Sequence, residues 1–434
     1  MLSTTGQDRP GNLLRPPGES ARVTNVELFF DLVYVFAVTQ LSHYLIDHRT
    51  AGGALQALLL LAMVWLVWAY TTWVTNWLDP GRIPVRLMLL GLALVSLVMS
   101  AALPFAFAGR GLAVGGGYAL MQTGRSAFAV AGLRGQRLQR NFQRILAWCV
   151  ASGALAVAGG LVAGHARELL WLGAVAVDVL GGLAGFYTPG LGRSRTRDWT
   201  IEGNHFAERC QAFILIALGE SIVVIGAALS ALASVTVQEI IAFLAAFTGS
   251  VGLWWLYFHR SAEESAQVIA SSADPGRLGR SGYHLIHPVM VAGIIVVAAG
   301  DQLVLRSPGA VGGVAVSAML LGGTALFLLG HAAFKAVVWG RVSWTRIAGA
   351  VVLAALGGLA PSVSALVLSV CVAVVVLGVA AADSLTPAAR SPDPSPPGPP
   401  GPPGAPGSAG SAGDLSSIWC TSASVLPGIP APDR

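Results

Sequence analysis

Ionisable side chains inside long apolar segments are the residues of this sequence best placed to do chemistry. Each one costs roughly 2.5 to 3.5 kcal/mol at the centre of a bilayer, so it needs a partner, a path for water or a role in moving a solute. Several unequal titratable groups suit a coupled transporter better than a uniform pore. The candidates for translocation or coupling are Glu27, Asp31, Arg125, Asp178, His205, Glu208, Arg209 and Glu220.

One charged stripe is expected on the helix that begins near residue 205. At 100° per residue, His205, Arg209 and Glu220 fall within about 60° of one another. Glu220 lies about 22 Å along the axis from His205, well past the nearer leaflet, and no acid or base stands within one turn of it. We therefore expect Glu220 to be buried without a strong partner and to serve as a proton-coupling group. Glu27 and Glu208 are weaker candidates, because each lies within a turn of its helix start.

Arg125 is expected to neutralise a carboxylate of the first helix. It lies inside a span, remote from both ends, and should share the cytoplasmic half of the membrane with Glu27 and Asp31. Asp178 is equally remote from the ends of its own span. A second interpretation stays open, in which these groups are buried ion pairs that fix the register of the helices and no solute is transported.

Sites of the soluble type are not indicated. His284 and His287 have the i, i+3 spacing of two metal ligands, but no third His, Cys or acid lies near them in sequence. The segment 219–221 is not a nucleophile elbow, and no nucleotide-binding glycine pattern follows a strand. We expect no metal site, no cofactor and no enzymatic activity.

The elements that must position the candidate residues are membrane-spanning helices. Of the 434 residues, 54% are hydrophobic and 11% are charged, whereas a soluble chain carries about a quarter charged residues. The charge-free stretch 347–382 would measure about 54 Å as one helix, so Gly357, Gly358 and Pro361 are taken to mark a turn between two spans. Ten further spans are predicted at roughly 26–45, 53–76, 86–107, 112–133, 145–163, 169–187, 205–229, 240–258, 283–304 and 314–338.

The fold class expected is therefore an all-α polytopic membrane protein of about twelve helices. Tryptophans such as Trp65, Trp68, Trp254 and Trp255 cluster mostly toward the ends of the predicted spans. Amphipathic indole rings favour the boundary between headgroups and hydrocarbon. We interpret these side chains as an interfacial belt.

The distribution of basic residues predicts the orientation. With twelve spans, the side that holds both termini carries twenty of the 26 Lys and Arg residues, and the opposite side carries four. Both termini are therefore predicted to be cytoplasmic by the positive-inside rule. The net charge of +5 then needs no nucleic-acid partner. The expected partners are membrane lipids and an unknown small solute or ion, and a homo-oligomer is left open.

The two groups of six spans resemble one another in sequence. Because six helices return the chain to the same side, the repeats are predicted to be parallel. The matches follow the same order through five successive helices: Glu27 and Thr39 with Glu208 and Glu220; Leu66, Trp68 and Tyr70 with Leu253, Trp255 and Tyr257; Pro84 with Pro288; Ala119, Leu120, Gly124 and Phe128 with Ala325, Leu326, Gly330 and Phe334; Arg144 with Arg346.

Five parts of the chain follow from these patterns. They are a cytoplasmic N-terminal segment (1–22), a first six-helix repeat (23–190), a cytoplasmic loop (191–204), a second repeat (205–383) and a C-terminal tail (384–434). The tail is rich in Pro, Gly and Ser and cannot bury enough apolar surface to fold. We expect it to be disordered and cytoplasmic.

Two sequence blocks carry a resemblance to a known family. The block ELFFDLVYVFAVTQLSH at residues 27–43 and the block HFAERCQAFILIALGES at residues 205–221 resemble the bacterial low temperature requirement protein A family, and the likeness extends from about residue 22 to 383. The resemblance implies a polytopic protein of the cytoplasmic membrane that is linked to growth in the cold. Family membership does not establish a molecular activity, because the name describes a phenotype.

A weaker resemblance concerns mechanism. The stretch 29–34, on the first helix of a doubled six-helix unit, is similar to two-repeat potassium channels whose first helices open with Phe-Ser-Asp. Here Phe30 stands in place of the serine, and the repeat position that corresponds to Asp31 is Ala212. We predict a transporter of a small solute or ion. The alternatives are an ion channel lined by the first and seventh helices, and a non-transporting scaffold or intramembrane enzyme.

The predicted orientation can be tested with reporter fusions placed after Arg144 and after Arg390. Both fusions should report the cytoplasm, because both positions lie on the side that holds most of the basic residues. A periplasmic signal from either fusion would contradict the twelve-span arrangement.

Overall fold

The computed structural model describes residues 13–15, 22–195, 202–259, 261–272 and 274–385. Within these ranges the chain is helical and forms no β-sheet, so the all-α class is confirmed. The last helix ends at Leu385, two residues beyond the predicted end of the second repeat at 383. The remainder of the predicted tail lies outside the described residues.

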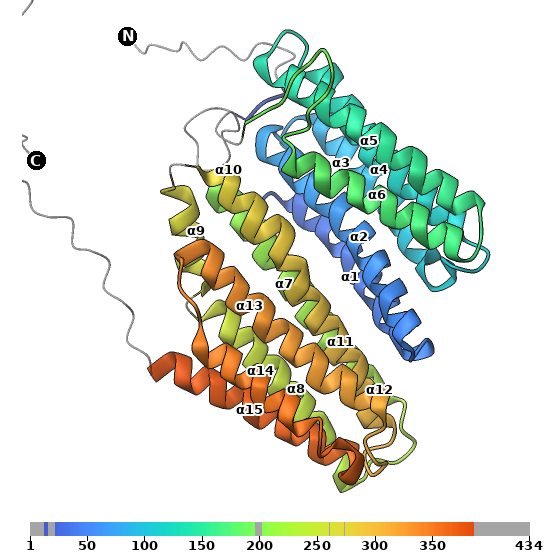
Figure 1. Ribbon diagram of the computed structural model, residues 1–434, viewed down its shortest axis with the longest axis vertical. Coiled ribbons are helices and arrows are strands. Elements are labelled where there is room, and N and C mark those ends of the chain that lie inside the picture. Colours follow the sequence, from blue (N-terminus) through green and yellow to red (C-terminus); the bar gives the residue numbers. More distant parts are fainter. Residues whose placement is uncertain (1–12, 16–21, 196–201, 260, 273, 386–434) are drawn as a thin grey trace, which may run out of the picture. The chain divides into compact units, whose positions relative to one another are not determined.

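Every predicted span coincides with a helix of the structure (Figure 1). The first half contains α1 (Asn25–Asp47), α2 (Ala51–Trp77), α3 (Ile83–Ala102), α4 (Gly111–Gly132), α5 (Arg137–Leu161) and α6 (His165–Leu183). The second half contains α7 (Gly203–Ser230), α8 (Val237–Phe258), a continuous helix made of α10 (Pro275–Leu278), η3 (Gly279–Ile286) and α11 (His287–Arg306), another made of α12 (Val314–Ser317), η4 (Ala318–Gly322) and α13 (Gly323–Trp339), and then α14 (Trp344–Leu356) and α15 (Ala365–Leu385).

Nine helices in the described part of the chain are long and apolar enough to cross a membrane. The three weaker spans are α4, which is rich in glycine, α6, which carries Arg167, Glu168 and Asp178, and α14, which has only 13 residues. The predicted turn between the last two spans is confirmed, because α14 ends at Leu356 and the short helix η5 (Ala360–Ser362) contains Pro361. A short helix, α9 (Ser261–Ala270), was not predicted.

The two halves pack their helices in the same way. In the first half α1 contacts α3, α3 contacts α4, α4 contacts α5, and α5 contacts α6; in the second half α7 contacts α11, α11 contacts α13, α13 contacts α14, and α14 contacts α15. The matched arginines also have similar roles. Arg144, about two turns into α5, donates to the carbonyl of Leu191 after α6, and Arg346 at the start of α14 donates to Asp383 near the end of α15. This correspondence is what a repeated unit predicts.

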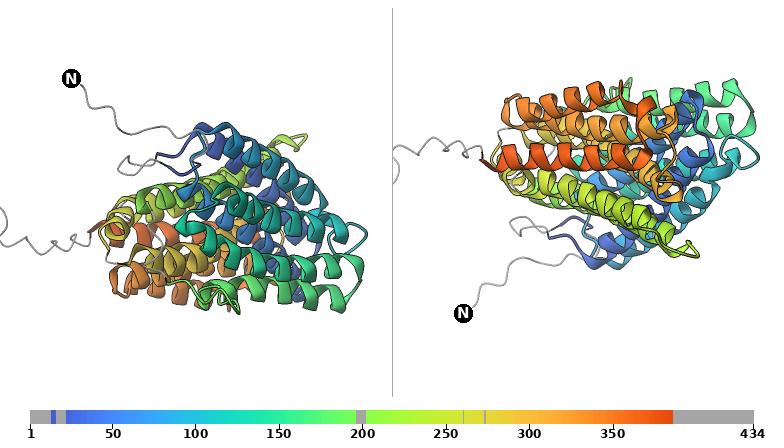
Figure 2. Two further views of the ribbon diagram at one scale, coloured as in Figure 1. Left: turned by 90° about the horizontal axis from the view of Figure 1, so that it is seen from above. Right: turned by 90° about the horizontal axis from the view of Figure 1, so that it is seen from below.

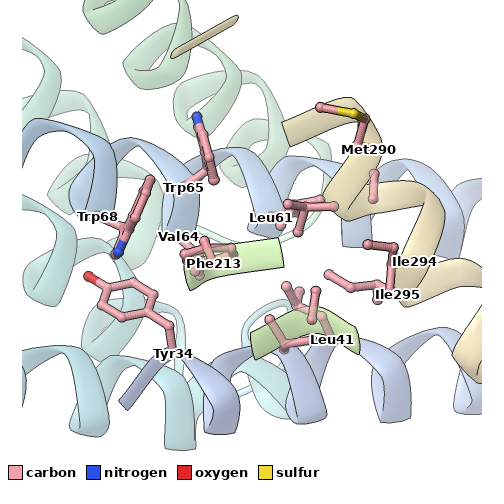
Figure 3. Packing of buried hydrophobic residues seen from close by; sticks show 14 of the residues in the cluster. Tyr34, Leu41, Leu61, Val64, Trp65, Trp68, Phe213, Met290, Ile294 and Ile295 are labelled. Atoms are coloured by element: carbon pink, nitrogen blue, oxygen red, sulfur yellow. The ribbon is translucent and has the colours of Figure 1, made fainter. Parts of the chain in front are cut away.

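Four helices, two from each half, form the centre of the bundle. Helices α1 and α2 lie against α7 and α11, while α3–α6 and α8, α13–α15 flank them on opposite sides (Figures 1 and 2). Figure 3 shows their side chains pointing toward one another: Tyr34 and Leu41 from α1, Leu61, Val64, Trp65 and Trp68 from α2, Phe213 from α7, and Met290, Ile294 and Ile295 from α11. The buried core therefore spans the boundary between the halves.

Glycines allow the closest helix contacts in both halves. A Cβ added to Gly115 of α4 would lie 2.1 Å from the carbonyl oxygen of Ala156 in α5, and one added to Gly293 of α11 would lie 2.6 Å from the backbone nitrogen of Phe327 in α13. In a membrane the hydrophobic effect does not drive helices together, so they associate by close packing, and small residues allow their backbones to approach. Van der Waals contact at these glycines thus stabilises each half.

Replacing Gly115 with alanine should part α4 from α5 and lower the free energy of unfolding by about 1–3 kcal/mol. The matched control is Gly116→Ala on the same helix, where an added Cβ meets no atom within 4 Å. The control should be neutral or slightly stabilising, since alanine favours a helix more than glycine does. Thermal unfolding of purified protein in detergent measures the difference, and equal midpoints for the two variants would contradict the close contact.

Candidate functional site

A cluster of buried charges joins α1 to α7, and Arg209 lies at its centre. The Arg209 guanidinium donates through Nε and Nη2 to the two carboxylate oxygens of Asp31 at 2.8 and 2.6 Å, and through Nη1 to Glu27 at 3.0 Å. All three side chains are at most 1% exposed. The fork of an arginine matches a carboxylate in this two-bond geometry. We call Arg15, Glu27, Asp31, His205 and Arg209 the ion-pair cluster.

Glu27 has two roles in the ion-pair cluster. It caps the start of α1, because its Oε2 accepts from the backbone N–H and the hydroxyl of Thr24 at 3.0 and 2.9 Å. Its Oε1 lies 2.9 Å from His205 Nε2, and Arg15 Nη2 donates to Oε2 at 3.3 Å. Glu27 was predicted to be a weaker candidate because of its place at the helix start, yet that place lets it bridge Arg209 and His205.

Several partners of the cluster were missed by sequence reasoning. Arg15 comes from the N-terminal segment and also donates to the Thr75 carbonyl at 2.9 Å. Trp68 donates its indole N–H to Asp31 at 2.7 Å, and Asn76 Nδ2 lies 3.3 Å from His205 Nδ1. The interfacial interpretation of Trp68 was wrong, because this side chain is fully buried in the protein core. An indole N–H on a buried ring needs an acceptor, and Asp31 supplies it.

The predicted pairing of Arg125 with Glu27 or Asp31 was wrong. Arg125 Nη1 donates to the Val67 carbonyl and the Thr71 hydroxyl, both at 3.2 Å, and Nη2 donates to the side-chain oxygen of Gln122. Arg209 occupies the acids of α1 instead. The prediction for Arg125 depended only on its expected depth in the membrane. Arg209 lies at a similar depth, so depth could not distinguish the two arginines.

Asp178 belongs to a second network on α4 and α6. Tyr118 donates its hydroxyl to Asp178 Oδ2, and Gln122 Nε2 donates to the same atom at 2.5 Å. Because the other end of Gln122 accepts from Arg125, the amide links the acid to the base without direct contact. Among the described residues, no carboxylate lies within 4.0 Å of the Arg125 nitrogens.

The predicted stripe of α7 divides into two sites. His205 and Arg209 reach the ion-pair cluster, whereas Glu220 lies farther along the helix, is 1% exposed and has no hydrogen-bond partner for Oε1. Its polar neighbour is Thr39 of α1, the residue matched to Glu220 in the repeat alignment. Glu208 is exposed and points away from the cluster.

Asp301 is a buried acid that sequence reasoning passed over. It lies in α11, one turn before the helix ends at Arg306, and is 4% exposed beside the buried Gln302. The available signal was the same as for the other candidates, namely an acid within a long apolar run. Packing of α11 in the centre of the bundle buries it.

A cavity of about 320 Å³ opens beside Arg125. We call it the arginine cavity, because four arginines line it and none of its described lining residues is acidic. The first half contributes most of the lining, and α10 and η3 of the second half contribute Gly276, Arg280 and His284. Its described aromatic side chains are those of Tyr70, Trp73, Trp77, Phe142, Phe186 and His284. Its arginines are Arg125, Arg193, Arg195 and Arg280.

Pro288 shapes the wall of the second half next to this cavity. Proline has no N–H, so the carbonyl four residues earlier, that of His284, loses its helical partner. Trp65 of α2 donates its indole N–H to this carbonyl at 2.9 Å, and residues 279–286 form a π-helix before α11 begins. His287, for which the sequence indicated no metal site despite its i, i+3 spacing with His284, places Nε2 3.2 Å from the Cys210 carbonyl and 3.3 Å from the Tyr257 hydroxyl.

Comparison with known proteins identifies the family. The profile of the bacterial low temperature requirement A protein (LtrA) matches residues 22–381. The chain belongs to the LtrA family. The resemblance of the blocks at residues 27–43 and 205–221 is therefore confirmed, and this LtrA family member is a multi-pass membrane protein.

A relative of similar length supports the LtrA assignment. The chain is 36% identical over 357 residues to the uncharacterized protein RA0937 of Rhizobium meliloti (strain 1021). The alignment covers 82% of this chain and 87% of that relative. No solved structure matches the chain.

The ion-pair cluster can be tested by a double-mutant cycle on Arg209 and Asp31. Arg209→Gln strands two buried carboxylates and should lower the free energy of unfolding by about 3–5 kcal/mol. Asp31→Asn in the same chain should restore part of the loss, with a coupling energy of about 0.5–3 kcal/mol from unfolding in detergent.

The matched control for this cycle is Arg125→Gln combined with Asp31→Asn. These two residues lie in separate networks, so their effects should add to within about 0.5 kcal/mol. Additive losses for Arg209 with Asp31, together with coupling of Arg125 to Asp31, would reverse the assignment of partners.

Proposed function

We propose that this LtrA family member is a transporter of a small solute or ion, and that the arginine cavity is its solute site. The observation that carries the proposal is a cavity of about 320 Å³ whose lining comes from both halves of the chain. Small-molecule sites occupy roughly 300–1,000 Å³, and transporters with repeated halves bind solutes between the halves. A solute there contacts side chains that move apart when one half rocks against the other.

The ion-pair cluster supplies the fixed contact about which such motion occurs. Arg209 belongs to the second half, while Glu27 and Asp31 belong to the first. Removing either partner leaves an unpaired buried charge, which costs several kcal/mol. The cluster therefore keeps α1 against α7 while the flanking helices shift, and this tight pairing argues against a water-filled pore between those two helices.

Glu220 is the proposed coupling group. Its carboxyl is buried, one oxygen has no hydrogen-bond partner, and its polar neighbour is the neutral Thr39. An acid without a basic partner in this environment exchanges a proton more readily than one held by arginine. Asp31, by contrast, is held by three hydrogen bonds from Arg209 and Trp68 and is better suited to a structural role.

The proposal includes no enzymatic activity. Both termini lie in the cytoplasm in the proposed orientation, in agreement with the distribution of basic residues. The arginine cavity then opens toward the cytoplasm at the turn that follows α6. Lipids surround the bundle, and the solute is the partner that the cavity binds.

Flux through reconstituted full-length protein tests the transport proposal. Proteoliposomes in salts of small acids, small amines or neutral sugars report uptake as osmotic swelling, followed by light scattering. A transporter gives saturable uptake of one class. A non-saturable ionic current would support the channel instead, and the absence of any flux would support a scaffold.

The coupling role predicts that Glu220→Gln abolishes proton movement driven by a solute gradient while the protein stays folded, since glutamine keeps the shape but cannot ionise. Pyranine trapped inside the vesicles measures the proton movement. The matched control is Glu208→Gln on the same helix, an exposed acid whose loss should leave the signal unchanged. Normal proton movement in Glu220→Gln would make this residue a structural hydrogen-bonding group.

A further inference from the structure

We propose that the arginine cavity binds a small anion whose charge is carried on a flat apolar body, such as an aromatic carboxylate. This inference names the ligand class of the proposed transport site and so rests in part on that function. The binding itself follows from the charge, packing and size of the cavity, and it can be tested without any flux.

The described lining of the cavity carries basic side chains and no acidic one. Arg125, Arg193, Arg195 and Arg280 line it, and none of its described lining residues is an acid. The nearest carboxylate described above is that of Asp178, which reaches Arg125 only through the amide of Gln122. Guanidinium groups gathered in a partly closed space attract anions, because the low-dielectric walls focus their field.

Arg125 is the cation that most needs an anion. It is fully buried, its Nε has no hydrogen-bond partner, and no described carboxylate lies within 4.0 Å of it. Arg167, another buried arginine, shows the contrast, because its Nε and Nη1 donate to four backbone carbonyls. A buried charge without a counter-ion is costly, so an anion in the cavity would complete the site of Arg125.

A second cation faces the cavity from the other half. Arg280 of η3 donates through Nη1 to the carbonyl of Gly182 at 3.1 Å, which holds its side chain at the end of α6. Its Nε is buried without a partner. Each half therefore contributes an arginine to the lining, and a carboxylate has two oxygens with which to accept from two guanidinium groups.

The remaining wall accounts for the apolar body of the ligand. Tyr70, Trp73, Trp77, Phe142 and Phe186 line the cavity with aromatic rings, and flat ligands pack against such rings with little loss of conformational freedom. A volume of about 320 Å³ lies at the small end of ligand pockets. An inorganic anion would not use this aromatic wall.

The turn after α6 is built to keep one of these rings in place. Gly185 and Phe186 both have positive φ, 65° and 51°, and a Cβ on Gly185 would lie 2.3 Å from the carbonyl oxygen of Ser194. Ser194 in turn donates its backbone N–H to the carbonyl of Gly185 at 2.9 Å. A phenylalanine in this conformation is strained. In this turn the Phe186 ring lies opposite the Tyr70 ring, with 6.2 Å between the ring centroids.

Equilibrium binding of radiolabelled 1-naphthoate to the full chain, purified in a neutral detergent, tests the proposal. The matched probe is 1-naphthamide, which keeps the ring and the shape but has no charge. Naphthoate should bind at least about tenfold more tightly than naphthamide, the value of one charge-assisted hydrogen bond. Equal binding of the two probes would overturn the proposal, because it would make the cavity a purely apolar pocket.

Three variants assign the binding to this cavity. Arg125→Gln should weaken naphthoate binding at least about tenfold. Arg193→Gln, on the exposed loop, should also weaken it, and this variant keeps the test valid where the buried substitution lowers the yield of folded protein. Arg86→Gln is the control, since this exposed arginine at the start of α3 lies outside the lining. An equal loss in all three variants would overturn the assignment.

A second arm distinguishes a soluble ligand from a lipid, because an anionic headgroup with its acyl chains offers the same chemistry. Native mass spectrometry compares the lipid retained from mixed phosphatidylglycerol and phosphatidylcholine nanodiscs by the wild-type chain and by Arg193→Gln. Naphthoate binding without lipid retention supports a soluble anion, and retention that depends on Arg193 supports a lipid headgroup. If the chain binds no naphthoate and retains no lipid, the proposal fails. Naphthoate binding without saturable uptake would overturn transport alone.

Discussion

The pairing of Arg209 with Asp31 and Glu27 is the interaction on which the structure depends. Three charges are removed from water at the boundary between two groups of helices, and hydrogen bonds among them and to their neighbours offset the loss of hydration. Neighbouring elements add hydrogen bonds to these carboxylates. Trp68 donates to Asp31, Thr24 donates to Glu27, and Arg15 of the N-terminal segment also donates to Glu27. The association of the two halves is therefore specified by ionic partners as well as by the apolar core between α1, α2, α7 and α11.

The positions of the helices could be predicted from the sequence because they depend on local properties. Runs of apolar residues determine where a helix lies in the membrane, and the turn at Pro361 follows from the length of a charge-free stretch. Helical periodicity also placed His205 and Arg209 on one face. The choice between Arg125 and Arg209 as partner of Asp31 could not be made this way, because it depends on which helices are neighbours. Arg15 and Trp68 were missed for the same reason.

The two halves resemble one another internally but differ at their shared boundary. Helix α11 packs across the boundary against α1 and α2 as well as against α7 and α13, while its counterpart α3 packs mainly against α1 and α4 of its own half. Trp68 on α2 is fully buried, and Trp255 at the matched position of α8 is 40% exposed. Ala212 stands at the position that corresponds to Asp31. The two carboxylates of the ion-pair cluster therefore come from α1, and the arginine that joins them comes from α7.

The short helix α14 affects the surrounding bilayer. Its 13 residues span about 20 Å at 1.5 Å per residue, against a hydrocarbon thickness of about 30 Å. Val351 and Val352 on this helix are exposed and face the acyl chains. Such hydrophobic mismatch is relieved when the lipid thins locally. We therefore expect the bilayer beside α14 to be thinner than around the longer helices, and lipids with shorter chains to gather along this side of the bundle.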